Sequence, residues 1–105
     1  RTKISEGCDG RVSGYFVEPS HFKLNTGKLK DLIGGDAGDN ARITEDILNG
    51  SKGVKRDIVL LNSAPAIMAC NKTKSWEAAM AIAAESIDSG AAMEKLKSLR
   101  AFTNR

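Results

Sequence analysis

The first residues of the chain alternate between polar and apolar side chains on both sides of Cys8-Asp9-Gly10. Alternation is typical of β-strands, and Asp-Gly between two alternating runs favours a tight hairpin because glycine accepts a positive φ. We therefore predict a β-hairpin with strands over residues 2–6 and 12–17, ended by Pro19. Isolated hairpins are marginal in water, so this one is expected to pack on a sheet or on helices.

After a polar connection over residues 20–35, the apolar positions take a helical spacing. Asp36 is placed to cap a helix that stops at Asn49-Gly50, and Ser75 to cap a helix that stops at Gly90. A last helix follows. The positions expected on the apolar faces of these helices are Ala37, Ala41, Ile43, Ile47 and Leu48, then Ala78, Ile82, Ala83 and Ile87, and finally Met93, Leu96, Leu99 and Phe102.

Between these helices, residues 57–70 are almost continuously apolar, broken only by Asn62 and Ser63. This pattern predicts a helix that follows Ser51-Lys52-Gly53, is covered on nearly all sides and forms the core. Pro65 is its irregularity, because proline lacks an N–H and crowds the carbonyl four residues earlier, at a cost of roughly 3 kcal/mol. We expect a kink or an interruption within a turn of Leu61.

Composition narrows the possible functions. The chain has 105 residues and 41% hydrophobic content, enough for one small core. Its 16 Lys and Arg are interspersed with 13 Asp and Glu for a net charge of +3, which disfavours nucleic-acid binding. No apolar run is long enough to span a membrane and no signal core is present, so we expect a cytoplasmic protein. Cys8 and Cys70 lack metal or redox spacing and are interpreted as buried or idle thiols.

The residues that could carry chemistry form no motif. His21 has no second histidine or cysteine at ligand or triad spacing. Gly34-Gly35-Asp36 precedes a helix, a geometry that can hold phosphate, but Asp36 would place a negative charge there, so we favour a structural helix entry. The remaining candidates, which equally suit helix ends or solvated faces, are the carboxylates Asp36 with Asp39, Glu45 with Asp46, and Asp57, and the basic cluster Lys52, Lys55 and Arg56.

We therefore assign no catalytic, substrate-binding or metal-ligating residue within the chain. The order of several segments is more informative. They are Asp9-Gly10-Arg11-Val12 with Tyr15, Val17, Pro19 and Phe22; Leu32 with Gly34-Gly35-Asp36-Ala37 and Asn40-Ala41; Ile47-Leu48-Asn49-Gly50; Arg56-Asp57 with Val59 to Asn62; and Ala84-Glu85-Ser86-Ile87-Asp88-Ser89-Gly90 leading to Leu96. Together they resemble the anthranilate phosphoribosyltransferases over essentially the whole chain.

This resemblance implies an α/β parent enzyme that transfers phosphoribosyl from phosphoribosyl pyrophosphate to anthranilate in tryptophan biosynthesis, with Mg²⁺ as cofactor. Residues 1–105 would be the C-terminal segment of its larger, nucleoside phosphorylase-like α/β domain. The N-terminal helical domain, the first part of the α/β domain and the substrate and metal ligands would lie outside this sequence. The resemblance thus implies a segment that is inactive alone and that partners the remainder of a homodimeric enzyme.

Two residues depart from the family pattern. Lys23 stands where the family usually has glycine, and Pro65 stands where small helix-forming residues are commoner. Two alternatives stay open: the C-terminal part of a related nucleoside phosphorylase, and a non-catalytic binding or regulatory module derived from the same fold. Arg1 enters a strand pattern without any lead-in, which favours a piece of a longer protein.

Overall fold

The chain begins with the predicted hairpin, in a computed structural model that describes residues 1–104. Strands β1 (Thr2–Cys8) and β2 (Arg11–Val17) pair antiparallel, with Thr2 opposite Val17 and Cys8 opposite Arg11. Asp9 and Gly10 make the turn, with φ of 51° and 77°. Positive φ at both turn residues suits the right-handed twist of the strands. The hairpin is thus confirmed, and both strands extend closer to the turn than we expected.

The connection between the hairpin and the first long helix contains two short 3₁₀ helices, η1 (Pro19–Phe22) and η2 (Leu29–Leu32). Pro19 ends β2 and begins η1, as proline at a helix start can because its missing N–H has no helical partner there. Lys23 follows with φ of 58°, in the left-handed region that favours glycine. Lys23 therefore replaces the family's usual glycine at a backbone conformation that residues with a side chain adopt at a cost.

Four helices follow: α1 (Ala37–Leu48), α2 (Val54–Ala69), α3 (Trp76–Asp88) and α4 (Ala91–Thr103). The Asp36 carboxylate accepts a hydrogen bond from the Asp39 N–H at 2.8 Å, and the Ser75 hydroxyl oxygen accepts one from the Ala78 N–H at 3.2 Å. Both predicted N-caps are therefore confirmed, and so is the order of a hairpin followed by four helices.

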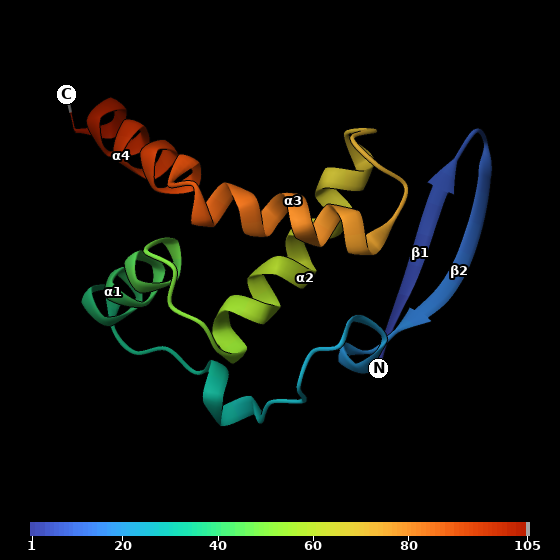
Figure 1. The fold of residues 1–105 in the computed structure, drawn as a ribbon, viewed down its shortest axis with the longest axis horizontal. Coiled ribbons are helices and arrows are strands. Elements are labelled where there is room, and N and C mark those ends of the chain that lie inside the picture. The colour runs from blue at the N-terminus through green and yellow to red at the C-terminus, as the bar shows by residue number, and fades with distance from the viewer. Residues whose placement is uncertain (105) are drawn as a thin grey trace.

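The core lies where α3 crosses α2 (Figure 1). Its buried centre consists of Leu60 from α2 with Ala83 and Ile87 from α3. The half-buried side chains packed around this centre are Ile47, Leu48, Val59, Ile67, Met80, Ala84 and Ala92. All four helices therefore contribute, but the fully buried part is small.

The prediction that α2 is covered on nearly all sides is wrong for the described residues. Only Arg56, Leu60 and Ala64 are buried, one every four residues along a single face. Ile58, within the most apolar part of the helix, is 38% exposed. The apolar run was read correctly as a helix, but residues 1–104 fully bury only one side of it.

The apolar faces of the other helices also differ in detail from the prediction. In α3 the buried residues are Ala79, Ala83 and Ile87, whereas Ile82 is 39% exposed. The predicted positions that are exposed in α1 and α4 are Ala37, Ala41, Leu99 and Phe102. Because packing against a neighbour decides which side of an apolar helix is buried, periodicity alone could not separate these positions.

Pro65 lies inside α2, and the helix runs through it without interruption. The predicted interruption is therefore wrong, while the predicted kink stays a prediction. Since proline has no N–H, the Leu61 carbonyl receives no helical hydrogen bond from residue 65. Two residues before Pro65, the Ser63 hydroxyl donates a hydrogen bond to the Val59 carbonyl at 2.7 Å.

An aromatic cluster attaches the hairpin to the start of α3. Trp76 stacks on Phe22, with ring centroids 5.3 Å apart, and meets Tyr15 edge to face at 6.4 Å. The Trp76 Nε1–H donates a hydrogen bond to the Tyr15 hydroxyl at 3.1 Å. Aromatic pairs in these geometries are worth about 0.5–1.5 kcal/mol beyond burial, so the cluster stabilises the attachment of the hairpin to α3.

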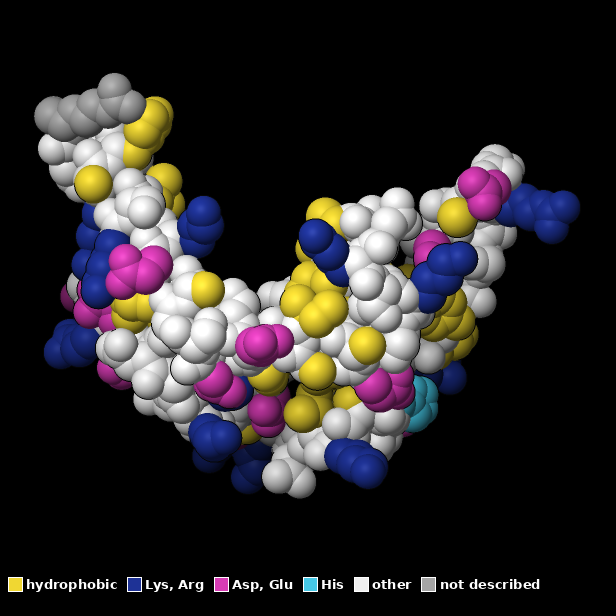
Figure 2. Space-filling model, turned by 45° about the horizontal axis from the view of Figure 1, so that its top comes forward, with side chains coloured by type: hydrophobic (Ala, Val, Ile, Leu, Met, Phe, Trp, Pro, Cys, Tyr) yellow, Lys and Arg dark blue, Asp and Glu magenta, His cyan; other side chains and the backbone are white. Residues whose placement is uncertain are grey.

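The hairpin and α4 extend from the body as two arms, within overall dimensions of 43 × 32 × 23 Å. Figure 2 shows hydrophobic side chains gathered on the central part of the molecule, between the α4 arm and the hairpin. No helix within residues 1–104 is long and apolar enough to cross a membrane.

Candidate functional site

The glycine-rich turn before α1 is occupied by its own side chains. The Asn40 amide oxygen accepts from the Gly35 N–H at 3.0 Å, and Asp39 accepts from the Asp36 N–H at 3.3 Å. A Cβ on Gly34 would lie 2.0 Å from the Asn40 amide oxygen. The glycines therefore make room for the Asn40 side chain, and the N–H groups of Gly35, Asp36 and Asp39 already donate to side chains of this turn. The structure thus bears out the predicted Asp36 cap at this helix entry.

His21 also has a local structural role. Its Nδ1 accepts a hydrogen bond from the Glu18 N–H at 3.2 Å, and its ring meets Phe22 edge to face with centroids 6.2 Å apart. It closes the η1 turn below the hairpin. No group of three or more His, Cys, Asp or Glu side chains among the described residues could hold a metal ion.

The candidate carboxylates lie apart from one another. Asp36 and Asp39 cap α1, and Glu45 pairs with Arg100 of α4. Asp46 borders an open groove beside the start of α2, whereas Asp57 borders a different groove on α2. The structure therefore brings no two of these candidates together beyond the Asp36–Asp39 capping pair.

The basic cluster divides into two kinds of residue. Lys52 and Lys55 border the groove at the start of α2, but Arg56 turns inward and its side chain is only 7% exposed. Our interpretation of all three as solvated is therefore wrong for Arg56. The missed signal was its position four residues before Leu60, on the face that α2 buries.

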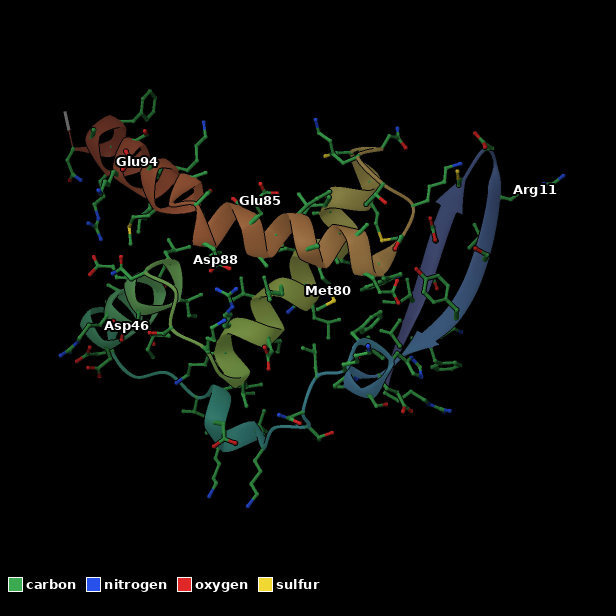
Figure 3. The ribbon with its side chains drawn as sticks, viewed as in Figure 1. Arg11, Asp46, Met80, Glu85, Asp88 and Glu94 are labelled. Atoms are coloured by element: carbon green, nitrogen blue, oxygen red, sulfur yellow. The ribbon has the colours of Figure 1, made fainter. Side chains whose placement is uncertain are left out.

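Arg56 makes a bidentate pair with Asp88 at the end of α3. Its two terminal nitrogens donate to the two Asp88 carboxylate oxygens at 2.9 and 3.0 Å. Asp88 projects from α3 toward α2 (Figure 3). These hydrogen bonds, with a smaller charge effect from Arg56 and then Lys52, hold the pKa of Asp88 below its ordinary value, although desolvation opposes the shift. The pair fixes α3 against α2 and satisfies the buried guanidinium.

A mainly apolar concavity runs along α2, and we call it the α2 groove. Three segments form it: the base of the hairpin, the connection around η2, and one side of α2. Its lining residues are Arg1, Thr2, Val17, Glu18, Pro19, Leu24, Asn25, Thr26, Gly27, Lys28, Leu29, Leu32, Val54, Asp57, Ile58 and Leu61. Cys8 and Cys70 are exposed free thiols outside this groove, so the buried interpretation of them is wrong.

Comparison with known proteins places this geometry in a family. Residues 1–93 match the model of the glycosyl transferase family, a/b domain. The chain belongs to this family. Its α/β assignment agrees with a fold in which a hairpin precedes four helices.

Relatives extend the comparison across almost the whole chain. The chain is 42% identical over 103 residues to a Desulfosudis oleivorans protein. This alignment covers 97% of the chain and 30% of the relative. The chain is 41% identical over 104 residues to a Methanobrevibacter smithii protein, covering 99% and 31% respectively. A Citrifermentans bemidjiense protein is 50% identical over 97 residues, covering 92% and 27%.

All three relatives are named anthranilate phosphoribosyltransferase. The resemblance read from the sequence is thereby confirmed. The chain spans about 30% of the length of the curated relatives it matches.

Proposed function

We propose that this chain is the C-terminal segment of the larger α/β domain of an anthranilate phosphoribosyltransferase. The supporting observation is 41–50% identity over nearly the whole chain to proteins of that name. The reaction would join the anthranilate nitrogen to the anomeric carbon of phosphoribosyl pyrophosphate, break the bond from that carbon to the diphosphate oxygen, and release the amine proton. The tryptophan pathway, a homodimeric parent and a cytoplasmic location belong to the same proposal.

Within this enzyme, the segment would support the site and not supply its reacting groups. Asp36 and Asp39 cap α1, Glu45 and Asp88 form ion pairs, and His21 closes a turn. No group of three or more His, Cys, Asp or Glu among residues 1–104 could hold a metal ion. We therefore assign no residue here to Mg²⁺, whose ligands the proposal puts in the rest of the enzyme. The chain's own contribution is a fixed arrangement of α2 and α3, held by the Arg56–Asp88 pair.

A chimera tests this function directly. The matching 103-residue segment of the Desulfosudis oleivorans relative is replaced by this chain, and turnover is followed as loss of anthranilate fluorescence in the presence of phosphoribosyl pyrophosphate and Mg²⁺. We expect turnover by the chimera and by the unaltered relative, and none by the 105-residue chain alone.

Three results would refute the proposal. A folded chimera without turnover, beside an active relative, would favour a non-catalytic module. Turnover by the isolated chain would reveal an active site within these residues. Phosphorolysis of a pyrimidine nucleoside, in place of phosphoribosyl transfer, would instead assign the chain to the nucleoside phosphorylases.

A further inference from the structure

The turn that ends α1 contains a chemically reactive dipeptide, Asn49-Gly50. An asparagine followed by glycine readily loses its side-chain amide, because the next backbone nitrogen can attack the side-chain carbonyl carbon. Glycine has no Cβ to obstruct that attack. Every other asparagine of the sequence is followed by a larger residue, so Asn49 is the most reactive of them by local sequence.

The fold requires the glycine of this dipeptide. Gly50 has a φ of 99°, in the left-handed region that favours glycine. Its N–H donates to the Ile47 carbonyl at 3.0 Å, and the Ser51 N–H donates to the Asp46 carbonyl at 3.0 Å. These two hydrogen bonds form a Schellman cap, which commonly has glycine at this position. The cap of α1 therefore retains Gly50, and with it the reactive junction.

The Asn49 side chain is accessible. The residue is exposed, and within residues 1–104 its side chain makes no hydrogen bond. The Asn40 amide, by contrast, is held by both the N–H and the carbonyl of Gly35. An open groove borders the turn through Ser51, so water can reach it. Nothing in the described part of the chain therefore shields the Asn49 amide from reaction.

The backbone of the same cap holds the reaction back. Ring closure requires the Cα–Cβ bond of Asn49 to be nearly eclipsed with the peptide bond to Gly50. Asn49 has a ψ of 2°, which eclipses the Gly50 nitrogen with the Asn49 nitrogen instead. The hydrogen bond to Ile47 also keeps the attacking nitrogen in the helix. The last turn of α1 must therefore open before the ring can form, and local opening has a free-energy cost.

We propose that Asn49 is a deamidation site whose rate is set by opening of the α1 cap. The Gly50 nitrogen bonds to the Asn49 Cγ, the Cγ–Nδ2 bond breaks, and Nδ2 leaves as ammonia with the proton from the Gly50 nitrogen. Water then opens the resulting succinimide at either of its carbonyl carbons. One product is aspartate, and the other is isoaspartate, whose backbone runs through Cβ and Cγ.

Both products change the end of α1. They add a carboxylate at the helix C-terminus, where negative charge is unfavourable and where the last turn has no basic residue. Isoaspartate also lengthens the backbone within the cap and displaces the N–H groups of Gly50 and Ser51 from their acceptors. Deamidation would therefore record opening of α1 irreversibly. This inference does not depend on the proposed function.

Peptide mapping tests the site and its control by the cap. The 105-residue chain and the chimera are incubated in mildly alkaline buffer with and without denaturing urea, and circular dichroism follows their helix content. Trypsin releases residues 43–52, in which Asn49 is the sole asparagine, and residues 24–28, in which the exposed Asn25 precedes Thr26. Mass spectrometry times the conversion of each amide to a carboxylate, and an isoaspartate-specific methyltransferase detects isoaspartate.

In urea, Asn49 should deamidate at least about tenfold faster than Asn25, because the β-branched Thr26 obstructs attack. Where the helices are intact, Asn49 should react at least about tenfold more slowly than in urea, since reaction awaits local opening. Asn49→Gln is the control, because it keeps an amide but needs a larger ring, and residue 49 should then stay unmodified. A rate at Asn49 no higher than at Asn25 in urea would overturn the site. Equal rates with and without urea, while the helices are intact, would overturn control by the cap.

Discussion

At the scale of single residues, side chains that resemble functional groups turn out to hold the backbone. The stretch before α1 is a glycine-rich turn at a helix N-terminus, a geometry that also occurs at anion sites. Asn40 nevertheless binds both the N–H and the carbonyl of Gly35, at 3.0 and 3.1 Å, and Asp36 accepts from Asp39. The sequence could predict the Asp36 cap because capping depends on local chain order. It could not predict the Asn40 contact, which depends on how closely the glycines approach the helix.

Replacement of Asp36 by alanine tests this capping role. In the chimera, Asp36→Ala should lower the free energy of unfolding by about 1 kcal/mol, because the Asp39 N–H loses its acceptor. Affinity for phosphoribosyl pyrophosphate should not change. Urea unfolding and a binding titration give the two quantities, and Asp36→Asn, which retains a capping oxygen, is the control. Lost affinity with unchanged stability would make Asp36 a ligand residue instead.

The Arg56–Asp88 pair predicts a specific pH dependence. Hydrogen bonds from Arg56 lower the pKa of Asp88 in the folded state below its ordinary value of 3.8, which applies to the unfolded chain. The pair therefore stabilises the fold above pH 3.8. The contribution is lost as the pH falls through the lowered pKa. Asp88→Asn should therefore reduce stability at neutral pH and flatten its decline below about pH 4.

Urea unfolding at several pH values measures this decline. Glu85→Gln, on an exposed position of the same helix, provides the control because it removes a carboxylate without removing the pair. The control should keep the original acid dependence. If Asp88→Asn kept it as well, the pair would not contribute to the stability of the fold.

At the scale of elements, the sequence predicted the existence and order of the hairpin and helices well. Turn residues and caps mark where elements begin and end, and those signals are local. Burial was predicted less well because it depends on neighbours. Arg56 was taken as solvated although α3 covers it and Asp88 pairs with it, and Ile58 was taken as core although it is exposed. The α2 groove was likewise beyond prediction, since three segments distant in sequence form it.

Pro65 gives a prediction at the level of one helix. Since α2 continues through Pro65, the missing hydrogen bond and the crowding of the Leu61 carbonyl persist in the folded state. Pro65→Ala should therefore raise the free energy of unfolding by up to about 3 kcal/mol. The gain is reduced because alanine makes the unfolded chain more flexible than proline does. Pro65→Gly should gain about 1 kcal/mol less than alanine. Thermal and urea unfolding decide the sign, and a loss of stability would mean that Pro65 relieves a constraint within α2.

The aromatic cluster predicts how the hairpin is held. Trp76→Phe retains an aromatic ring but removes the Nε1–H that donates to Tyr15. The loss should be about 0.5–1.5 kcal/mol, the usual net value of one hydrogen bond, and should appear mainly as faster amide hydrogen exchange in β1 and β2. Faster exchange in α2 and α3 to the same extent would show that the cluster stabilises the whole chain and not the hairpin attachment.

At the scale of the whole molecule, little fully buried apolar surface supports a chain with two extended arms. The buried apolar residues are Val17, Leu60, Ala64, Ala79, Ala83 and Ile87, and half of them are alanines. Alanine contributes little area, so the hydrophobic contribution to folding is modest. Domains of ordinary stability have only about 5–15 kcal/mol in total, and the isolated chain should lie at the lower end of that range or below it.

Leu60 makes this expectation measurable, because it is the largest side chain from α2 in the buried centre. Leu60→Ala should cost about 2–5 kcal/mol through lost burial and an internal cavity. In the isolated chain that loss should remove the cooperative thermal transition seen by circular dichroism. If the proposed function holds, the chimera surrounds these residues with the rest of an α/β domain, and the variant should still unfold cooperatively there at a lower temperature. A cooperative transition retained by the isolated Leu60→Ala chain would show that these residues form an independently stable domain.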